Sequence, residues 1–225
     1  MSNSVSISLG MQCTTAAYLK DTNRRSHSFP FDWMLAPPTF VFEMLRLLLR
    51  ENMDPLELVV KYFYALDKKV TINLDDPEHY KTTDDVALPN KLNSRYDAIF
   101  PHDYSFDQDE VKRKYARRFQ RLKDLILNKD IALDFFYVSQ SSGKNGNFTI
   151  DCRNVVVDVF NSLRLINDLM IDYHGQSFRI IVFDTLRQED PNVHFVSTPN
   201  VHVHYLEPKN KFFEMFPQMM TINVN

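Results

Sequence analysis

The sequence predicts an α/β protein with a mostly parallel central sheet and helices on both faces. Segments typical of strands and of helices alternate along the chain, as they do when crossovers between parallel strands carry helices. The segment 178–183 is almost continuously apolar, which indicates a strand buried on both faces. A chain of 225 residues suits one large domain better than two, so we expect a single domain over 1–225.

The N-terminal part predicts a strand followed by two helices. Apolar and small polar residues alternate over 5–9 and stop at Gly10, which indicates a strand that runs into a turn. Residues 14–20 contain no helix breaker and predict a helix. The proline pair 37–38 opens the next helix, because proline is tolerated in a first turn. Cys13 therefore lies at a junction between a strand and a helix.

The middle of the chain is predicted to leave the core. Residues 56–66 are interpreted as helical and residues 70–74 as extended. Proline, aspartate and threonine are frequent from 75 to 93, as in a long excursion. We therefore expect an insertion or flap over 67–95, followed by a strand at 96–100.

The second half predicts further alternation of helices and strands. After Ser105, apolar residues recur near every 3.6 positions and predict a helix with an acidic first turn. Aromatic and β-branched residues indicate a strand at 131–138, and a second periodic segment predicts a helix over 153–173. Strands at 178–183 and 201–205 complete the predicted sheet.

Composition excludes several classes of protein. The four glycines cannot form a dinucleotide-binding fingerprint or a phosphate-binding P-loop, which both need several glycines around one turn. The two cysteines exclude a disulfide scaffold and a four-cysteine zinc site. A net charge of −3 argues against a chain-wide polycation. We expect no cofactor and no bound metal.

The chain also carries no signal for a membrane or for export. Its apolar runs are far shorter than a spanning helix needs, and its first residues lack the pattern of a signal peptide. We therefore expect a cytoplasmic, reducing location, with a virion as the other location to consider.

Candidate catalytic residues follow the predicted strands. The loops at the carboxyl ends of parallel strands meet at one edge of a sheet, where ligands bind. These loops carry Cys13, His102, Asp103 and Asp184. A thiol at a helix N-terminus ionises more readily, so Cys13 is the candidate nucleophile and His102 its general base. The amide of Cys13 and the side chain of Gln12 are candidate oxyanion donors.

Structural alternatives stay open for each of these residues. A single cysteine after a strand is often a small buried apolar residue without a chemical role. The ring nitrogens of His102 could be hydrogen-bonded within its own loop. Asp32, Asp103 and Asp184 compete to orient the imidazole. Asp184 is preferred over Asp103, since adjacent residues of an extended chain point to opposite sides.

Three further features permit a functional and a structural interpretation. Phe31 and Trp33 could wall a substrate pocket, although such aromatic clusters also pin loops to a core. The helix at 112–123 carries seven cations, which more often form a solvated face than a nucleic-acid site. His202 and His204 point the same way along a strand, but no carboxylate pattern supports a shared metal.

Two blocks of the sequence resemble a known family. Ser8–Gly10, Cys13, Arg25–Ser26 and Pro30–Trp33 are similar to the opening of a family of predicted papain-like cysteine peptidases, found in bacteria and large DNA viruses. His102 and the arginine-rich helix after it resemble the family's second block. The resemblance implies a nucleophilic Cys13, a basic His102 and a peptide or isopeptide substrate. It also implies a papain-like α+β fold, which we keep as the alternative to a parallel sheet.

Two function hypotheses follow. The first is a cysteine peptidase or a related thiol hydrolase or acyl transferase that acts on a peptide or protein. The second is a non-enzymatic structural or assembly protein, with self-association or a virion partner. It is motivated by the 13% aromatic content and by the apolar residues of 212–220.

Overall fold

The structure is a computed structural model that describes residues 4–10, 13–34, 36, 38–63, 109–139, 156–184, 198–207, 215–222 and 224. The predicted flap at 67–95 and the predicted strand at 96–100 lie outside these residues. In chain order the elements are β1 (Ser4–Ser8), α1 (Cys13–Asp21), α2 (Pro38–Leu49), α3 (Pro55–Leu58), the π-helical turn η1 (Val59–Phe63), α4 (Asp109–Leu127), β2 (Ala132–Ser139), α5 (Val156–His174), β3 (Phe178–Asp184), β4 (Val201–Tyr205) and α6 (Phe216–Thr221).

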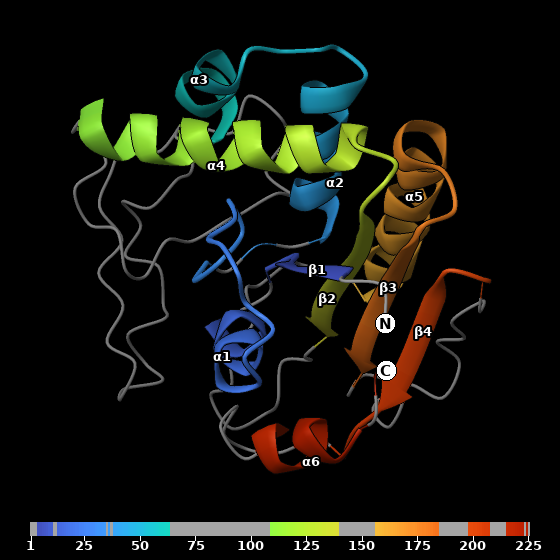
Figure 1. The fold of residues 1–225 in the computed structure, drawn as a ribbon. Coiled ribbons are helices and arrows are strands. Elements are labelled where there is room, and N and C mark those ends of the chain that lie inside the picture. Colours follow the sequence, from blue (N-terminus) through green and yellow to red (C-terminus); the bar gives the residue numbers. More distant parts are fainter. Residues whose placement is uncertain are drawn as a thin grey trace.

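The described strands form one parallel sheet in the order β1-β2-β3-β4 (Figure 1). This arrangement confirms the predicted parallel α/β architecture. The papain-like α+β alternative would have an antiparallel sheet, whereas the described strands pair in parallel. Ser8 lies beside Phe136, and Asp184 lies between Ser139 and Tyr205, so the carboxyl ends of all the paired strands share one edge.

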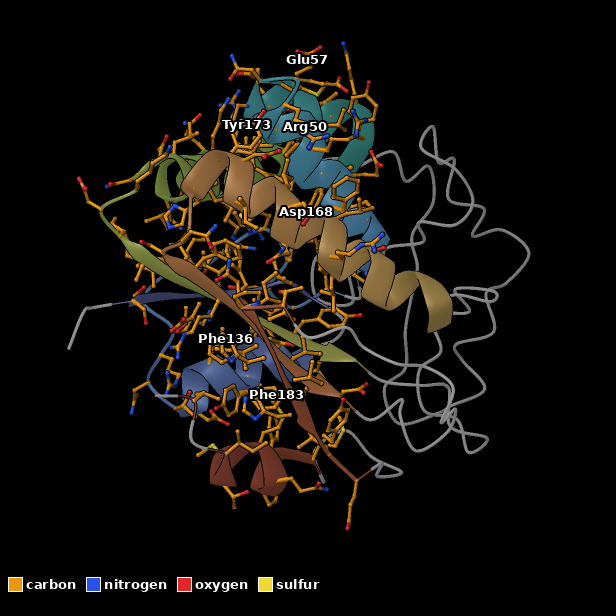
Figure 2. The ribbon with its side chains drawn as sticks, turned by 90° about the vertical axis from the view of Figure 1, so that its right-hand side faces the viewer. Arg50, Glu57, Phe136, Asp168, Tyr173 and Phe183 are labelled. Atoms are coloured by element: carbon orange, nitrogen blue, oxygen red, sulfur yellow. The ribbon has the colours of Figure 1, made fainter. Side chains whose placement is uncertain are left out.

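Helices cover both faces of the sheet (Figures 1 and 2). Along β2, Phe135 and Tyr137 belong to the core shared with α2, α4 and α5, whereas Phe136 and Val138 belong to the core shared with α1 and α6. This alternation follows from the two-residue period of a strand. Figure 2 shows Phe136 and Phe183 on the side of α1. Both sides of the strand are therefore apolar, as the near-continuous hydrophobic runs predict.

The structure describes the helix predicted at 56–66 as far as residue 63, and this part is only partly regular. Asp54 accepts hydrogen bonds from the backbone N–H groups of Leu56 and Glu57 and so caps α3, whose first residue is Pro55. After one turn the chain widens into η1, a change of helix type that an apolar periodicity does not encode. None of the helices in the described ranges combines the length and the apolarity that a bilayer span requires.

The C-terminal residues close the second core. Met215, Met219 and Val224 are buried against Tyr18 and the aromatic side chains of β2 and β3, which belong to the same cluster. Met220, in contrast, is 53% exposed. The apolar C-terminal residues thus complete the fold from inside, at least at the positions that the structure describes.

This packing predicts different costs for two adjacent methionines. We expect Met219→Ala to lower the free energy of unfolding by about 2–4 kcal/mol, because it leaves a cavity in the core. Met220→Ala is the matched control, with an expected change within about 0.5 kcal/mol. Urea unfolding measures both. Deletion of 211–225 should yield insoluble chain, and a soluble, folded truncation would show that this segment is not part of the core.

Candidate active site

The turn between β1 and α1 places Cys13 at the carboxyl edge of the sheet. The Leu9 N–H donates to the Phe136 carbonyl at 2.9 Å, so pairing with β2 extends beyond the last residue of β1. Gly10 then turns the chain with φ +85°. The Thr15 hydroxyl donates to the Gly10 carbonyl at 3.2 Å, which ties the first turn of α1 to the end of the strand. Cys13 is the first residue of this nine-residue helix.

The Pro30–Trp33 run packs directly on this turn. A Cβ atom at Gly10 would lie 2.9 Å from the Cβ of Ala36 and 3.5 Å from the Phe31 carbonyl oxygen. The 2.9 Å separation is closer than normal packing, so a larger residue at position 10 would require Ala36 to shift. The position of the turn before Cys13 is thus coupled to that of residues 29–36.

Two glycines with similar backbone conformations test this contact. Gly10→Ala should lower the free energy of unfolding by roughly 2–4 kcal/mol, from an unfavourable φ and from overpacking against Ala36. Gly175 has φ +86° but open space around its Cβ position, so Gly175→Ala should cost only about 1 kcal/mol. The difference, measured by urea unfolding, isolates the contact, and equal losses would show that Ala36 moves away freely.

Asp32 is the buried anchor of the Pro30–Trp33 run. Its side chain is 1% exposed, and one oxygen, Oδ2, accepts hydrogen bonds from Phe29 N–H at 3.0 Å and from Arg25 Nε and Nη2 at 3.1 and 2.8 Å. Burial raises the pKa of this carboxyl, while the Phe29 N–H and the Arg25 guanidinium oppose the shift. Asp32 thus holds the loop closed.

Arg25 connects this loop to α4. Its Nη2 also donates to Ser28 Oγ at 2.9 Å, and the Ser28 carbonyl accepts from Arg121 Nη1 at 2.7 Å. The Arg25 guanidinium lies 5.6 Å from the centre of the Trp33 ring. Arg25 therefore links a buried carboxylate and an aromatic ring directly, and it reaches α4 through Ser28.

The two aromatic residues of the run lie in different surroundings. Phe31 is fully buried and packs edge-on against Phe119 of α4, with 5.8 Å between ring centres. It is a core residue in this structure and does not line an open hollow. Trp33 is half-buried and has φ +60°, a conformation that costs free energy for a bulky side chain.

The structure places the remaining candidates unequally. Asp184 is the last residue of β3 and is 1% exposed at the predicted edge. By alternation from Val182, it lies on the face covered by α2, α4 and α5, whereas α1 covers the other face. Gln12, His102 and Asp103 lie outside the described residues, and of Cys13 only the backbone is described.

Most of the cations of α4 contact other residues of the protein. Arg121 bonds Ser28, Lys123 Nζ lies 2.7 Å from Asn52 Oδ1, and Lys112 pairs with Asp109 at 3.6 Å. Lys114 and Arg118 lie over the Tyr115 ring at 5.2 and 4.8 Å. These contacts favour the structural interpretation of the basic helix.

The paired histidines of β4 have no metal partners in the described part of the chain. Within those ranges, no group of three or more histidine, cysteine, aspartate or glutamate side chains could hold a metal ion. His204 packs beside Phe183 at 5.9 Å between ring centres. Burial lowers the pKa of His204, and the nearby His202 lowers it further.

Comparison with known protein families gives a match over most of the chain. A family model matches residues 4–182, from the first residue of β1 to the interior of β3. The matched segment includes Cys13, Asp32 and Trp33. Searches of curated proteins and of solved structures returned no significant match. Since the match covers well over half of the chain, this protein belongs to the family that the model describes as "Putative papain-like cysteine peptidase".

Proposed function

We propose that the chain is a thiol-dependent acyl hydrolase, a peptidase or a related transferase, with Cys13 as nucleophile and His102 as general base. One observation carries the proposal. Within the segment that matches the family, Cys13 begins a nine-residue helix directly after β1. Exposed N–H groups and the helix dipole at this position favour a thiolate, which is the reactive form.

The proposed reaction has two steps. His102 takes the proton of the Cys13 thiol, and the thiolate attacks the carbonyl carbon of a peptide or isopeptide bond. The Cys13 N–H and the Gln12 side chain donate to the resulting oxyanion. The amine leaves with the proton from His102, and a thioester remains. Water, deprotonated by His102, then releases the acid and restores the thiol; another acceptor amine makes the reaction a transfer.

Three aspartates could support the imidazole. The Asp32 Oδ2 atom already accepts three hydrogen bonds from the loop and Arg25, so we assign Asp32 to loop closure. Asp184, at the carboxyl edge, is our preferred orienting residue over Asp103, which follows His102 directly. Trp33 is proposed as a wall of the substrate site, because its run packs against the nucleophile turn.

The test measures how fast iodoacetamide modifies Cys13 as pH changes, with peptide mapping to identify the site. Under the proposal, the apparent thiol pKa falls below the ordinary value of about 8.5. His102→Asn should raise that pKa, because a neighbouring imidazolium stabilises the thiolate. An ordinary pKa that His102→Asn leaves unchanged would contradict the pair. Since a reactive thiol persists where thiols stay reduced, we also propose a cytoplasmic location.

The alternative assembly role is less well supported by the described residues of 212–220. It depended on the 13% aromatic content and on these apolar residues, of which Met215 and Met219 are buried in the core beside α1, whereas Met220 is 53% exposed. Self-association through this segment would require part of that core to open. We therefore propose the enzymatic role first and keep the assembly role as its alternative.

A further inference from the structure

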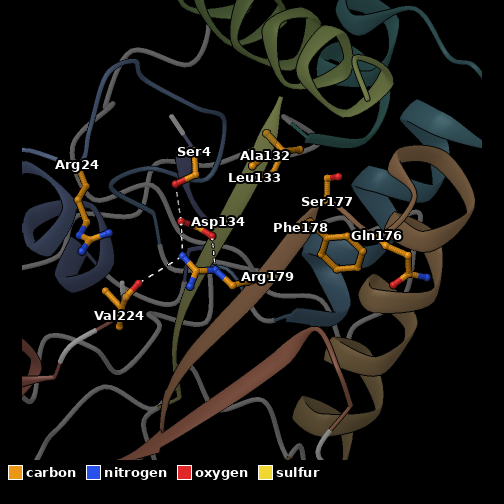
Figure 3. A pocket seen from close by; sticks show the side chains of 10 residues that line it. All are labelled: Ser4, Arg24, Ala132, Leu133, Asp134, Gln176, Ser177, Phe178, Arg179 and Val224. Carbon is orange, nitrogen blue, oxygen red and sulfur yellow. Dashed lines mark hydrogen bonds and ion pairs between the residues drawn. The ribbon is translucent and has the colours of Figure 1, made fainter. Parts of the chain in front are cut away.

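A hollow of about 670 Å³ lies at the amino edge of the sheet, opposite the edge that carries Cys13 (Figure 3). It is lined by residues at the starts of three strands, among them Ser4 of β1, Ala132 of β2 and Phe178 of β3. Arg24, which follows α1, and Val224, near the C-terminus, also line it. A hollow of this size can hold a small organic molecule.

A partly buried ion pair forms one wall of the hollow. Asp134, whose side chain is 3% exposed, accepts hydrogen bonds from Arg179 Nε at 2.8 Å and Nη2 at 2.9 Å. The Ser4 hydroxyl donates to the same carboxylate at 2.7 Å. These bonds fix the Arg179 guanidinium in one orientation, with Nη2 also donating to the Val224 carbonyl at 3.3 Å. Arg179 is therefore pre-organised rather than free to reorient.

Within the described ranges, the charged side chains that line the hollow are two arginines and one aspartate. They are Arg24, Arg179 and Asp134, and Asp134 already accepts three hydrogen bonds. The Nη1 of Arg179 makes no hydrogen bond to the residues that the structure describes, and the Arg179 side chain stays 36% exposed. A guanidinium held in this way presents its remaining donors as a fork that suits a carboxylate or a phosphate.

From this lining we propose that the amino-edge hollow is a binding site for a small organic anion, a carboxylate or a phosphate monoester. Its charged group lies against Arg179 Nη1 and Arg24, and its organic part lies against the apolar surface of Ala132 and Val224. The site is separate from the Cys13 turn, so it does not depend on the proposed acyl chemistry. Carboxylates and phosphates share the anionic group that the guanidinium recognises, and only measurement separates them.

The test is calorimetric titration of the full chain with benzoate, with phenyl phosphate and with neutral benzyl alcohol. We expect saturable 1:1 binding of at least one anion and none of the alcohol. Saturation by phenyl phosphate alone would assign phosphate monoesters, and saturation by benzoate alone would assign carboxylates. Absence of saturable binding by both anions overturns the proposal.

Variants then locate the site. Removing Arg179 alone would leave Asp134 buried and unpaired, so the two are replaced together as Asp134→Leu with Arg179→Met. This pair should weaken binding about tenfold or more, which is the loss expected for a charged hydrogen bond. Arg24→Gln should weaken it by about threefold or more, because a cation that lines the hollow is lost. Arg50→Gln is the control, because Arg50 forms an exposed ion pair with Asp172 and does not line the hollow. It should leave the affinity unchanged.

A chemical footprint on the unmodified chain keeps the result independent of variant folding. Phenylglyoxal modifies exposed arginines, and the bound anion should slow its reaction at Arg24 and Arg179 but not at Arg50. Equal affinity in wild type and in all folded variants, together with no protection at Arg179, would mean an adventitious ion only and would overturn the proposal.

Discussion

Replacing Cys13 with alanine should abolish acylation by thiol-directed peptide probes and lower peptidase or transferase turnover by at least about a thousand-fold. The reason is chemical, because alanine has no atom that can form the thioester. Intact-mass analysis of the probe-treated chain measures the acylation, and peptide mapping identifies the modified residue. The turnover readout uses a mixed peptide library as substrate.

The chain's other cysteine provides the matched control. Cys152→Ala removes one thiol of the two but leaves the proposed nucleophile, so labelling at Cys13 should persist. The folded state of each variant is checked by its urea unfolding curve. Labelling that survives Cys13→Ala, or a wild-type chain that takes up no probe at Cys13, would remove the enzymatic proposal.

Replacing Arg25 with methionine should destabilise the fold by about 3–5 kcal/mol near neutral pH, because it leaves a buried carboxylate without its partner. Asp32 is 1% exposed, whereas Arg25 is 20% exposed, so the cost falls on the aspartate that stays behind. Methionine keeps the apolar part of the long side chain, which separates loss of charge from loss of packing. The free energy of unfolding in urea measures the effect.

The loss should depend on pH in a fixed direction. Burial already raises the pKa of Asp32, and Arg25 is one of the groups that oppose the rise, so the variant's folded pKa should be higher still. A carboxyl with a raised folded pKa contributes stability that is fully present below its unfolded pKa and is lost as pH rises through the folded value. The deficit of Arg25→Met relative to wild type should therefore grow as pH rises above the unfolded pKa of an aspartate, about 3.9.

Two further variants separate this effect from general damage. Arg50→Met breaks an ion pair with Asp172 whose side chains are 50% and 55% exposed, and it should cost no more than about 1 kcal/mol. Adding Asp32→Asn to Arg25→Met removes the buried charge, so it should restore part of the stability and flatten the pH dependence. A deficit that is independent of pH would contradict the role of the buried carboxylate.

Most regular elements could be predicted from local pattern. The apolar run at 178–183 has side chains on both faces of the sheet, and its burial confirms that it is covered from both sides. Gly10 ends β1, and α1 begins at Cys13, as the alternation and the absence of helix breakers indicated. These features succeed because strand and helix periods depend on neighbours within a few residues.

The surroundings of the candidate site were less predictable. The roles proposed for Asp32 and Phe31 came from their residue types. The structure instead shows Asp32 bonded to Arg25 and Phe31 in the core against Phe119. An ion pair between loop residues seven positions apart produces no periodic pattern in the sequence. An aromatic residue is also found in the same sequence pattern whether its side chain lines a pocket or packs in a core. The sequence marked Arg25 only as part of the family resemblance and did not indicate that it pairs with Asp32.

What the sequence alone determined is the kind of protein: an α/β chain with a parallel sheet, without a nucleotide-binding glycine loop, and with Cys13 at a strand-to-helix turn. Only the tertiary structure decided that Ala36 packs on Gly10, that Arg25 holds Asp32, and that the starts of three strands form a hollow with Val224. The physical reason is range. Periodicity and turn chemistry act between near neighbours, whereas these contacts arise when separate segments close around one core.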